Sequence, residues 1–243
     1  MKKISIATGF VITVVLSALS VVAQTQSRED ILAQIAAKRA ELSALEKQFL
    51  SASPEDRAVY AEFLREPDTG IIRLLPRELY ESEVYRENKP TLTVRGGGAY
   101  YSFTARTHEY SRPTDIGLER GYLQAGFAGA NYGMLINVGD VPLENISLGT
   151  AAVHVLATHT VAEAEPQARI EQRRTSEGAV IEGVAYKNRL PIKLNSTYIV
   201  RTVNYEASDS LVAFKVIRID NDESATILWK ILKKYPTPHL ARN

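Results

Sequence analysis

The 243-residue chain contains no cysteine. This absence excludes a disulfide scaffold, a metal site with thiolate ligands and catalysis by a thiol nucleophile, because each needs at least one Cys. Net charge is also nearly absent, since 29 Lys and Arg residues face 28 Asp and Glu residues and leave a formal charge of +1. A dedicated nucleic-acid-binding domain is usually strongly basic, so nucleic acid is not an expected partner.

The motifs of the common catalytic and cofactor sites are missing as well. The chain has no Gly-x-Ser-x-Gly elbow and no Ser-x-x-Lys pair. His108 does not begin a zinc-protease motif, because position 112 is Arg, and the spacing of His154 and His159 suits chelation on neither a helix nor a strand. The glycines at 96–98 precede a tyrosine-rich segment instead of a helix, which predicts a tight turn or a close backbone approach and no phosphate site. We therefore expect no metal and no other cofactor.

What is present is typical of a folded globular protein. Apolar residues make up 45% of the chain and charged residues 23%, a composition that intrinsically disordered chains do not have. The first residues differ from the rest. Lys2 and Lys3 precede an apolar run over residues 4–22, and Val21 and Ala23 fit the small-residue positions of a signal-peptidase site.

This pattern predicts an export signal over residues 1–23 and places the mature protein in the periplasm or outside the cell. The short Lys-Lys start favours a bacterial protein. An uncleaved anchor is the alternative, because nineteen apolar residues can just span a bilayer of ~30 Å. Membrane contact is expected only through this segment, and only if it is not cleaved.

Residues 24–66 predict a helical arm or short coiled coil. Alanine-rich sequence predicts a helix over 28–51, and Ser53-Pro54 is typical of the start of a second helix. Heptad-like spacing relates five apolar residues of the first helix, interrupted by Lys38: Ile31, Ile35, Leu42, Leu45 and Phe49. This helix packs on its own domain, associates with a second copy of itself, or docks to another envelope protein.

Residues 67–243 predict a β-rich globular domain. Short alternating segments separated by glycines are typical of an antiparallel β-sandwich or a barrel-like body. Residues 99–106 predict a half-buried strand with Tyr101, Phe103 and Ala105 on one face, and residues 162–174 predict a short surface helix. An antiparallel meander is expected from three strong strands: Ser196–Tyr205, Leu211–Ile219 and Ala225–Lys234. The expected fold class is α+β, mainly β, with the helical segment at the N-terminus.

Two groups of side chains are weak candidates for a functional site. His108, Glu109 and Asp115 form an acid–base group if the fold brings them together, although a surface ion pair or strand edge is the simpler interpretation. Seven of the twelve tyrosines fall between residues 80 and 132. These tyrosines either pack in the core or form a binding face for sugar, peptide or protein. The candidates for that face are Tyr100, Tyr101, Tyr110, Tyr122 and Tyr132.

The sequence favours a non-catalytic binding or assembly module of the bacterial envelope. One alternative is a hydrolase of unrecognised type that uses His108, Glu109 and Asp115. The other is a structural protein that oligomerises through residues 28–51, which are also the expected contact for an envelope-protein partner.

Overall fold

The computed structural model describes residues 27–81, 92–111, 113–181 and 183–241. The expected export signal over residues 1–23 lies outside them. In the described part of the chain, no helix is both long enough and apolar enough to cross a membrane. Two compact units divide between Ala40 and Glu41, and the following paragraphs on the sheets concern the second unit alone.

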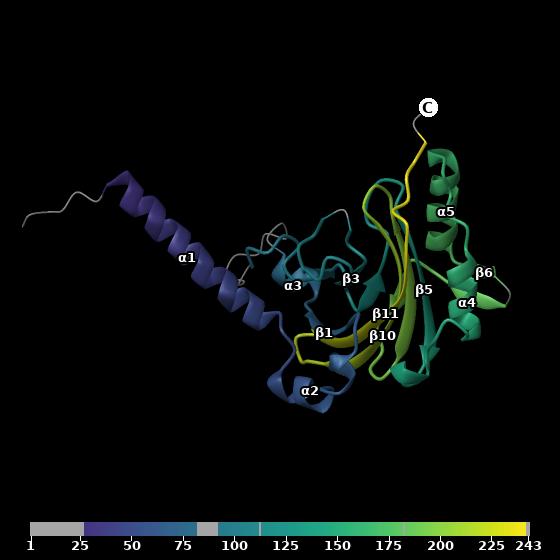
Figure 1. The fold of residues 1–243 in the computed structure, drawn as a ribbon, viewed down its shortest axis with the longest axis horizontal. Helices are drawn as coiled ribbons and strands as arrows, with labels where there is room; N and C mark the ends of the chain where they lie inside the picture. Colours follow the sequence, from purple (N-terminus) through teal and green to yellow (C-terminus); the bar gives the residue numbers. More distant parts are fainter. Residues whose placement is uncertain (1–26, 82–91, 112, 182, 242–243) are drawn as a thin grey trace, which may run out of the picture. The chain divides into compact units, whose positions relative to one another are not determined.

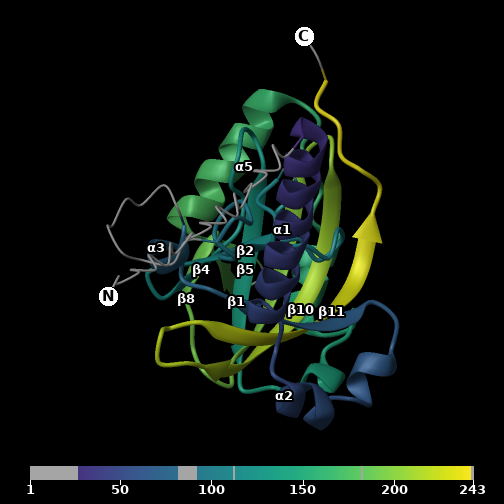
Figure 2. The ribbon, with the colours of Figure 1, turned by 90° about the vertical axis from the view of Figure 1, so that its left-hand side faces the viewer.

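The body is built on a five-stranded antiparallel sheet in the order β1-β11-β10-β9-β5 (Figure 1). β9, β10 and β11 form the meander that the sequence predicts, and β1 pairs with β11 along the outer edge (Figure 2). The strands are β1 Thr69–Leu74, β5 Tyr132–Gly139, β9 Thr197–Asn204, β10 Ser208–Ile219 and β11 Ala225–Tyr235.

A smaller sheet packs against one face of this large sheet. Its order is β2-β3-β4-β8, with β2 Tyr100–Tyr101, β3 Ile116–Glu119, β4 Tyr122–Gln124 and β8 Arg189–Pro191. Ile116 and Leu118 of the small sheet share one buried cluster with Phe214 and Trp229 of the large sheet. The expected mainly β, α+β fold is therefore confirmed, and the two facing sheets give the body a sandwich-like form.

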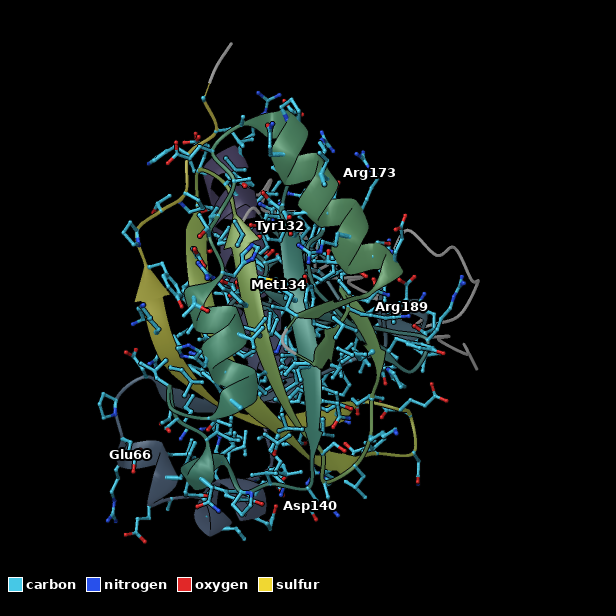
Figure 3. All side chains as sticks on the ribbon, turned by 90° about the vertical axis from the view of Figure 1, so that its right-hand side faces the viewer. Glu66, Tyr132, Met134, Asp140, Arg173 and Arg189 are labelled. Atoms are coloured by element: carbon cyan, nitrogen blue, oxygen red, sulfur yellow. The ribbon has the colours of Figure 1, made fainter. Side chains whose placement is uncertain are left out.

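Helices cover the opposite face of the large sheet. Figure 3 shows Tyr132 and Met134 of β5 with α4 (Ala151–Thr158) and α5 (Glu165–Glu177) on this side. Along β10, Leu211 and Ala213 belong to the helix-side cluster. The alternate residues Val212, Phe214 and Val216 belong to the cluster under the small sheet. This alternation follows from the period of two along a strand. α5 confirms the predicted surface helix, and α4 was not predicted. A two-stranded sheet of β6 (Ala179–Ile181) and β7 (Val184–Tyr186) completes this side.

Two further helices, α1 and α2, begin where the sequence predicts. α1 spans Arg28–Phe49, and the Ser27 hydroxyl accepts a hydrogen bond from the backbone N–H of Asp30 at its start. α2 spans Pro54–Val59 and is capped in the same way by Ser53. Ala52 and Phe63 lie in the helix-side core cluster of the body. The short helices are η1 Phe63–Arg65, α3 Arg77–Tyr80 and η2 Leu143–Asn145.

The strand predicted over residues 99–106 is wrong beyond Tyr101. β2 ends there, and the chain turns back so that Ser102 forms an isolated bridge with Thr107. The Phe103 backbone N–H donates a hydrogen bond of 2.7 Å to the buried Asp115 carboxylate. This N–H therefore needs no partner on a neighbouring strand. Ala105 is exposed and does not share a buried face with Tyr101. The alternating residues after Tyr101 therefore form a tight turn and not a strand.

The glycines at 96–98 confirm the predicted close backbone approach. All three have positive φ, at 87°, 60° and 75°. A Cβ at Gly97 would lie 2.5 Å from the backbone oxygen of Tyr80. Any larger residue would therefore push this turn away from α3.

Candidate functional site

A cavity of about 350 Å³ lies in the body, where residues 43–51 of the chain meet residues 106–109. Its buried lining comes from Glu46, Leu50, Ile71, Ile72 and Tyr101. Its exposed lining includes three cationic side chains: Lys47, Arg57 and Arg106. The volume falls at the lower end of the range for small-molecule sites.

Tyr101 contributes a phenol to the buried lining, which also holds the Glu46 carboxylate. It ends β2 and is only 5% exposed, with its ring 4.9 Å from the His108 ring and 6.2 Å from that of Trp229. Burial raises the pKa of Tyr101 to about 12, against the opposing effect of the positive charges on Arg106 and Arg57. The phenol is therefore neutral at physiological pH and serves as a hydrogen-bond donor.

His108 is held by the large sheet. Its Nε2 lies 2.9 Å from the backbone oxygen of Arg73 on β1. Because a carbonyl oxygen only accepts, Nε2 carries the proton and Nδ1 is left as the acceptor of the ring. Burial lowers the pKa of His108 to about 4, although the bond to Arg73 opposes this shift. The imidazole is therefore neutral at physiological pH.

Both carboxylates of the cavity are engaged by neighbouring residues. Glu46 is buried, and its oxygens accept hydrogen bonds from the Thr93 backbone N–H and, at 2.7 Å, from the Thr93 hydroxyl. Glu109 accepts a bond of 3.1 Å from the Arg95 backbone N–H. Among the described residues no ion pair engages Lys47 or Arg57. The three cations and two carboxylates give the lining a net formal charge of +1.

Asp115 lies away from this cavity, between the two sheets. It accepts hydrogen bonds from Phe103 N–H, the Thr202 hydroxyl at 2.6 Å, the Asn204 amide at 3.2 Å and the Ser102 hydroxyl at 3.4 Å. Burial raises the pKa of Asp115 to about 6, while these donors oppose the shift. The side chain fastens the turn that follows β2 to β9.

The structure therefore gives His108, Glu109 and Asp115 separate partners. His108 binds a backbone carbonyl of β1, Glu109 binds a backbone N–H, and Asp115 binds the network between the sheets. Within the described ranges these three do not form one hydrogen-bonded acid–base group. A catalytic role for them stays a prediction that the geometry does not support.

The five candidate tyrosines occupy four places in the fold. Tyr100 and Tyr110 pack at 4.6 Å beside Phe127 and line a second groove of about 670 Å³. Tyr122 is exposed on β4 under the guanidinium of Arg189. Tyr132, labelled in Figure 3, is buried on β5, and its hydroxyl lies 3.0 Å from His159 Nε2. Only Tyr101 lines the cavity described above.

The sequence analysis missed the three cations of the cavity. Lys47, Arg57 and Arg106 come from α1, α2 and the turn after β2. No spacing rule links them, because their proximity depends on how β1 and β2 bring these segments together. In the described part of the chain, no three His, Asp or Glu side chains gather in a way that could hold a metal ion.

No family model, no curated protein and no solved structure matches the chain. Function is therefore argued from the cavity and from the exposed surfaces alone.

Proposed function

We propose that the body is a non-catalytic binding module and that its binding site is the cavity beside Tyr101 and His108. The supporting observation is a concave site whose lining combines buried apolar side chains with a neutral phenol and a neutral imidazole. Tyr101 offers a donor, while Leu50 and Ile71 offer apolar contact. His108 commits its ring N–H to a backbone carbonyl, so binding is favoured over proton transfer at this site.

A cavity-filling variant tests this proposal. Ser43 is exposed on α1 and lines the cavity, so Ser43→Trp should occupy the site without disturbing the core. Ser176→Trp is the matched control, since Ser176 is an exposed helical serine on α5. In a ligand-observed NMR screen of small fragments, binding should be lost in the Ser43 variant and retained in the control. A screen in which no bound fragment is lost from the Ser43 variant would refute the proposal.

A second candidate function is assembly through α1. Six large apolar side chains of this one helix are 39% to 64% exposed: Ile31, Leu32, Ile35, Leu42, Leu45 and Phe49. Five of them follow the heptad-like spacing, which favours a second copy of the same helix as the partner. Their burial would remove apolar surface that monomeric proteins usually hide.

Light scattering tests assembly. The purified protein should have the mass of a dimer or larger, and the double change Leu42→Glu with Leu45→Glu should return it to one chain. Leu148→Glu with Leu194→Glu is the control, because these leucines are comparably exposed outside α1. A wild-type protein with the mass of one chain would rule out assembly through this helix.

We also propose that the protein is exported, on the sequence of residues 1–23 alone. Expression of the full chain in a bacterial host should yield a periplasmic form whose mass corresponds to a start near Gln24. An intact N-terminus retained in the membrane fraction would favour the anchor instead.

A further inference from the structure

The charges around the cavity point to the chemistry of its ligand. Lys47, Arg57 and Arg106 supply three positive charges against the two carboxylates of Glu46 and Glu109, so the lining keeps a net formal charge of +1. Both carboxylates already accept hydrogen bonds from residues 93–95. A group that carries negative charge would be attracted to this lining, whereas a cation would be repelled.

Two of these cations, Arg57 and Arg106, line the same cavity as Tyr101. Burial and the Asp115 carboxylate raise the pKa of the phenol, whereas the positive charges of the two arginines lower it. Coulomb interactions at a partly exposed site weaken quickly with distance and salt. An anionic group placed beside Tyr101 would therefore meet two guanidinium groups and one O–H donor.

Arg106 is already positioned for such a contact. Its guanidinium lies over the Trp229 ring at 5.4 Å, and its closest carboxylate, that of Asp68, is 3.9 Å away. A guanidinium that stacks on an aromatic ring keeps its in-plane N–H groups for a carboxylate, sulfonate or phosphate. Stacking on Trp229 also restricts the Arg106 side chain before a ligand arrives, so less conformational entropy is lost on binding.

The buried part of the lining adds a second requirement. Leu50, Ile71 and Ile72 are each 6% exposed or less and form an apolar wall. An inorganic anion would leave this wall uncovered, while an aromatic or aliphatic group would bury it at roughly 25 cal/mol per Å².

We infer that the cavity binds a small organic anion, with its charged group between Arg57, Arg106 and the Tyr101 hydroxyl and its apolar part against Leu50 and Ile72. This inference rests on the proposed binding function and adds the ligand class to it. A small carboxylate with an aromatic ring or a short alkyl chain has this chemistry and fits about 350 Å³.

Matched pairs of probes test the inference by NMR titration. Benzoate and benzamide have nearly the same shape and differ in charge, as do hexanoate and hexanamide. At least one carboxylate should bind about tenfold more tightly than its amide and more tightly than inorganic phosphate, and added salt should weaken it.

Variants of the cations complete the test. Arg106→Gln and Arg57→Gln should each weaken carboxylate binding about tenfold, and Arg57 is an exposed residue of α2 whose change should not affect folding. Arg173→Gln, at an exposed position on α5 that is labelled in Figure 3, is the control and should have no effect.

The outcomes separate the two proposals. If amides bind as tightly as carboxylates, or if both arginine variants bind normally while Ser43→Trp abolishes binding, the site binds ligands but the inferred anion is wrong. Phosphate binding as tight as that of the organic anions would overturn the apolar part of the inference. If Ser43→Trp abolishes the binding of no probe and no fragment, the proposed function itself fails, and the inference fails with it.

Discussion

Replacing Asp115 by Asn tests how the two sheets are joined. The side chain lies between the sheets and accepts hydrogen bonds from four donors, on the turn after β2 and on β9. Two effects on its pKa oppose each other. Burial disfavours the charged carboxylate and raises the pKa, while the donors favour the carboxylate and lower the pKa. The structure assigns the larger effect to burial.

The size of the effect follows from the pKa. In the folded protein the pKa of Asp115 is about 6, compared with an ordinary value of 3.8. One pKa unit corresponds to about 1.36 kcal/mol, so the difference amounts to about 3 kcal/mol. Between these two pKa values the folded state holds a proton that the unfolded state has lost. The free energy of unfolding therefore falls by about 3 kcal/mol from this group as the pH rises from about 3 to about 7.

The assay is urea unfolding of the wild type and of Asp115→Asn at several pH values. The difference between the two proteins is the informative quantity, because His108 titrates with a lowered pKa over the same range and adds stability as the pH rises. The Asn variant should gain about 3 kcal/mol relative to the wild type between pH 3 and pH 7. A variant that instead loses stability relative to the wild type over this range would show that the donors prevail over burial, and it would refute the reasoning.

Three further predictions concern other parts of the body. Gly97→Ala should lower the free energy of unfolding by more than about 2 kcal/mol, whereas Gly121→Ala, which has positive φ but open space around it, should cost about 1 kcal/mol. Equal losses in denaturant unfolding would contradict the close approach. Asp209→Asn should lower the free energy of unfolding by about 3 kcal/mol or more, because it leaves the buried Arg201 guanidinium without its carboxylate. Asp140→Asn, in an exposed pair with Lys215, should lower it by less than about 1 kcal/mol. Similar thermal stabilities for these two variants would argue against the buried pair. In an NMR titration His108 should change protonation near pH 4, and a midpoint near 6.5 would mean that the ring is solvated.

Local patterns were sufficient to predict most of the fold. β9, β10 and β11 are long, rich in β-branched residues and joined by short turns, so period and turn chemistry agree along this part of the chain. The strand prediction failed after Tyr101 for a physical reason. Their alternation is the same as that of a strand, but the partner of the Phe103 N–H is a carboxylate twelve residues away in the sequence, and no local pattern reports such a bond.

The candidate site was less predictable than the fold. Tyr101, His108 and Glu109 were singled out from the sequence and do line the cavity, but Asp115 does not. Arg57 was not singled out at all, since a solvated arginine on a short helix carries no distinctive sequence signal. Its position beside the cavity depends on tertiary packing between segments that are far apart in the chain.

The pairing of β1 with β11 also constrains how the protein is made. Residues 69–74 are synthesised long before residues 225–235, yet β11 is the only strand that β1 pairs with in the described part of the chain. A nascent chain that ends before residue 225 therefore carries β1 as an unpaired segment with two isoleucines to bury. Contacts of such large sequence separation form slowly, because a long loop must close before they are gained. The large sheet is thus completed only after β11 has emerged from the ribosome. Until then β1 and the exposed edge of β10 can pair with other chains, which favours aggregation.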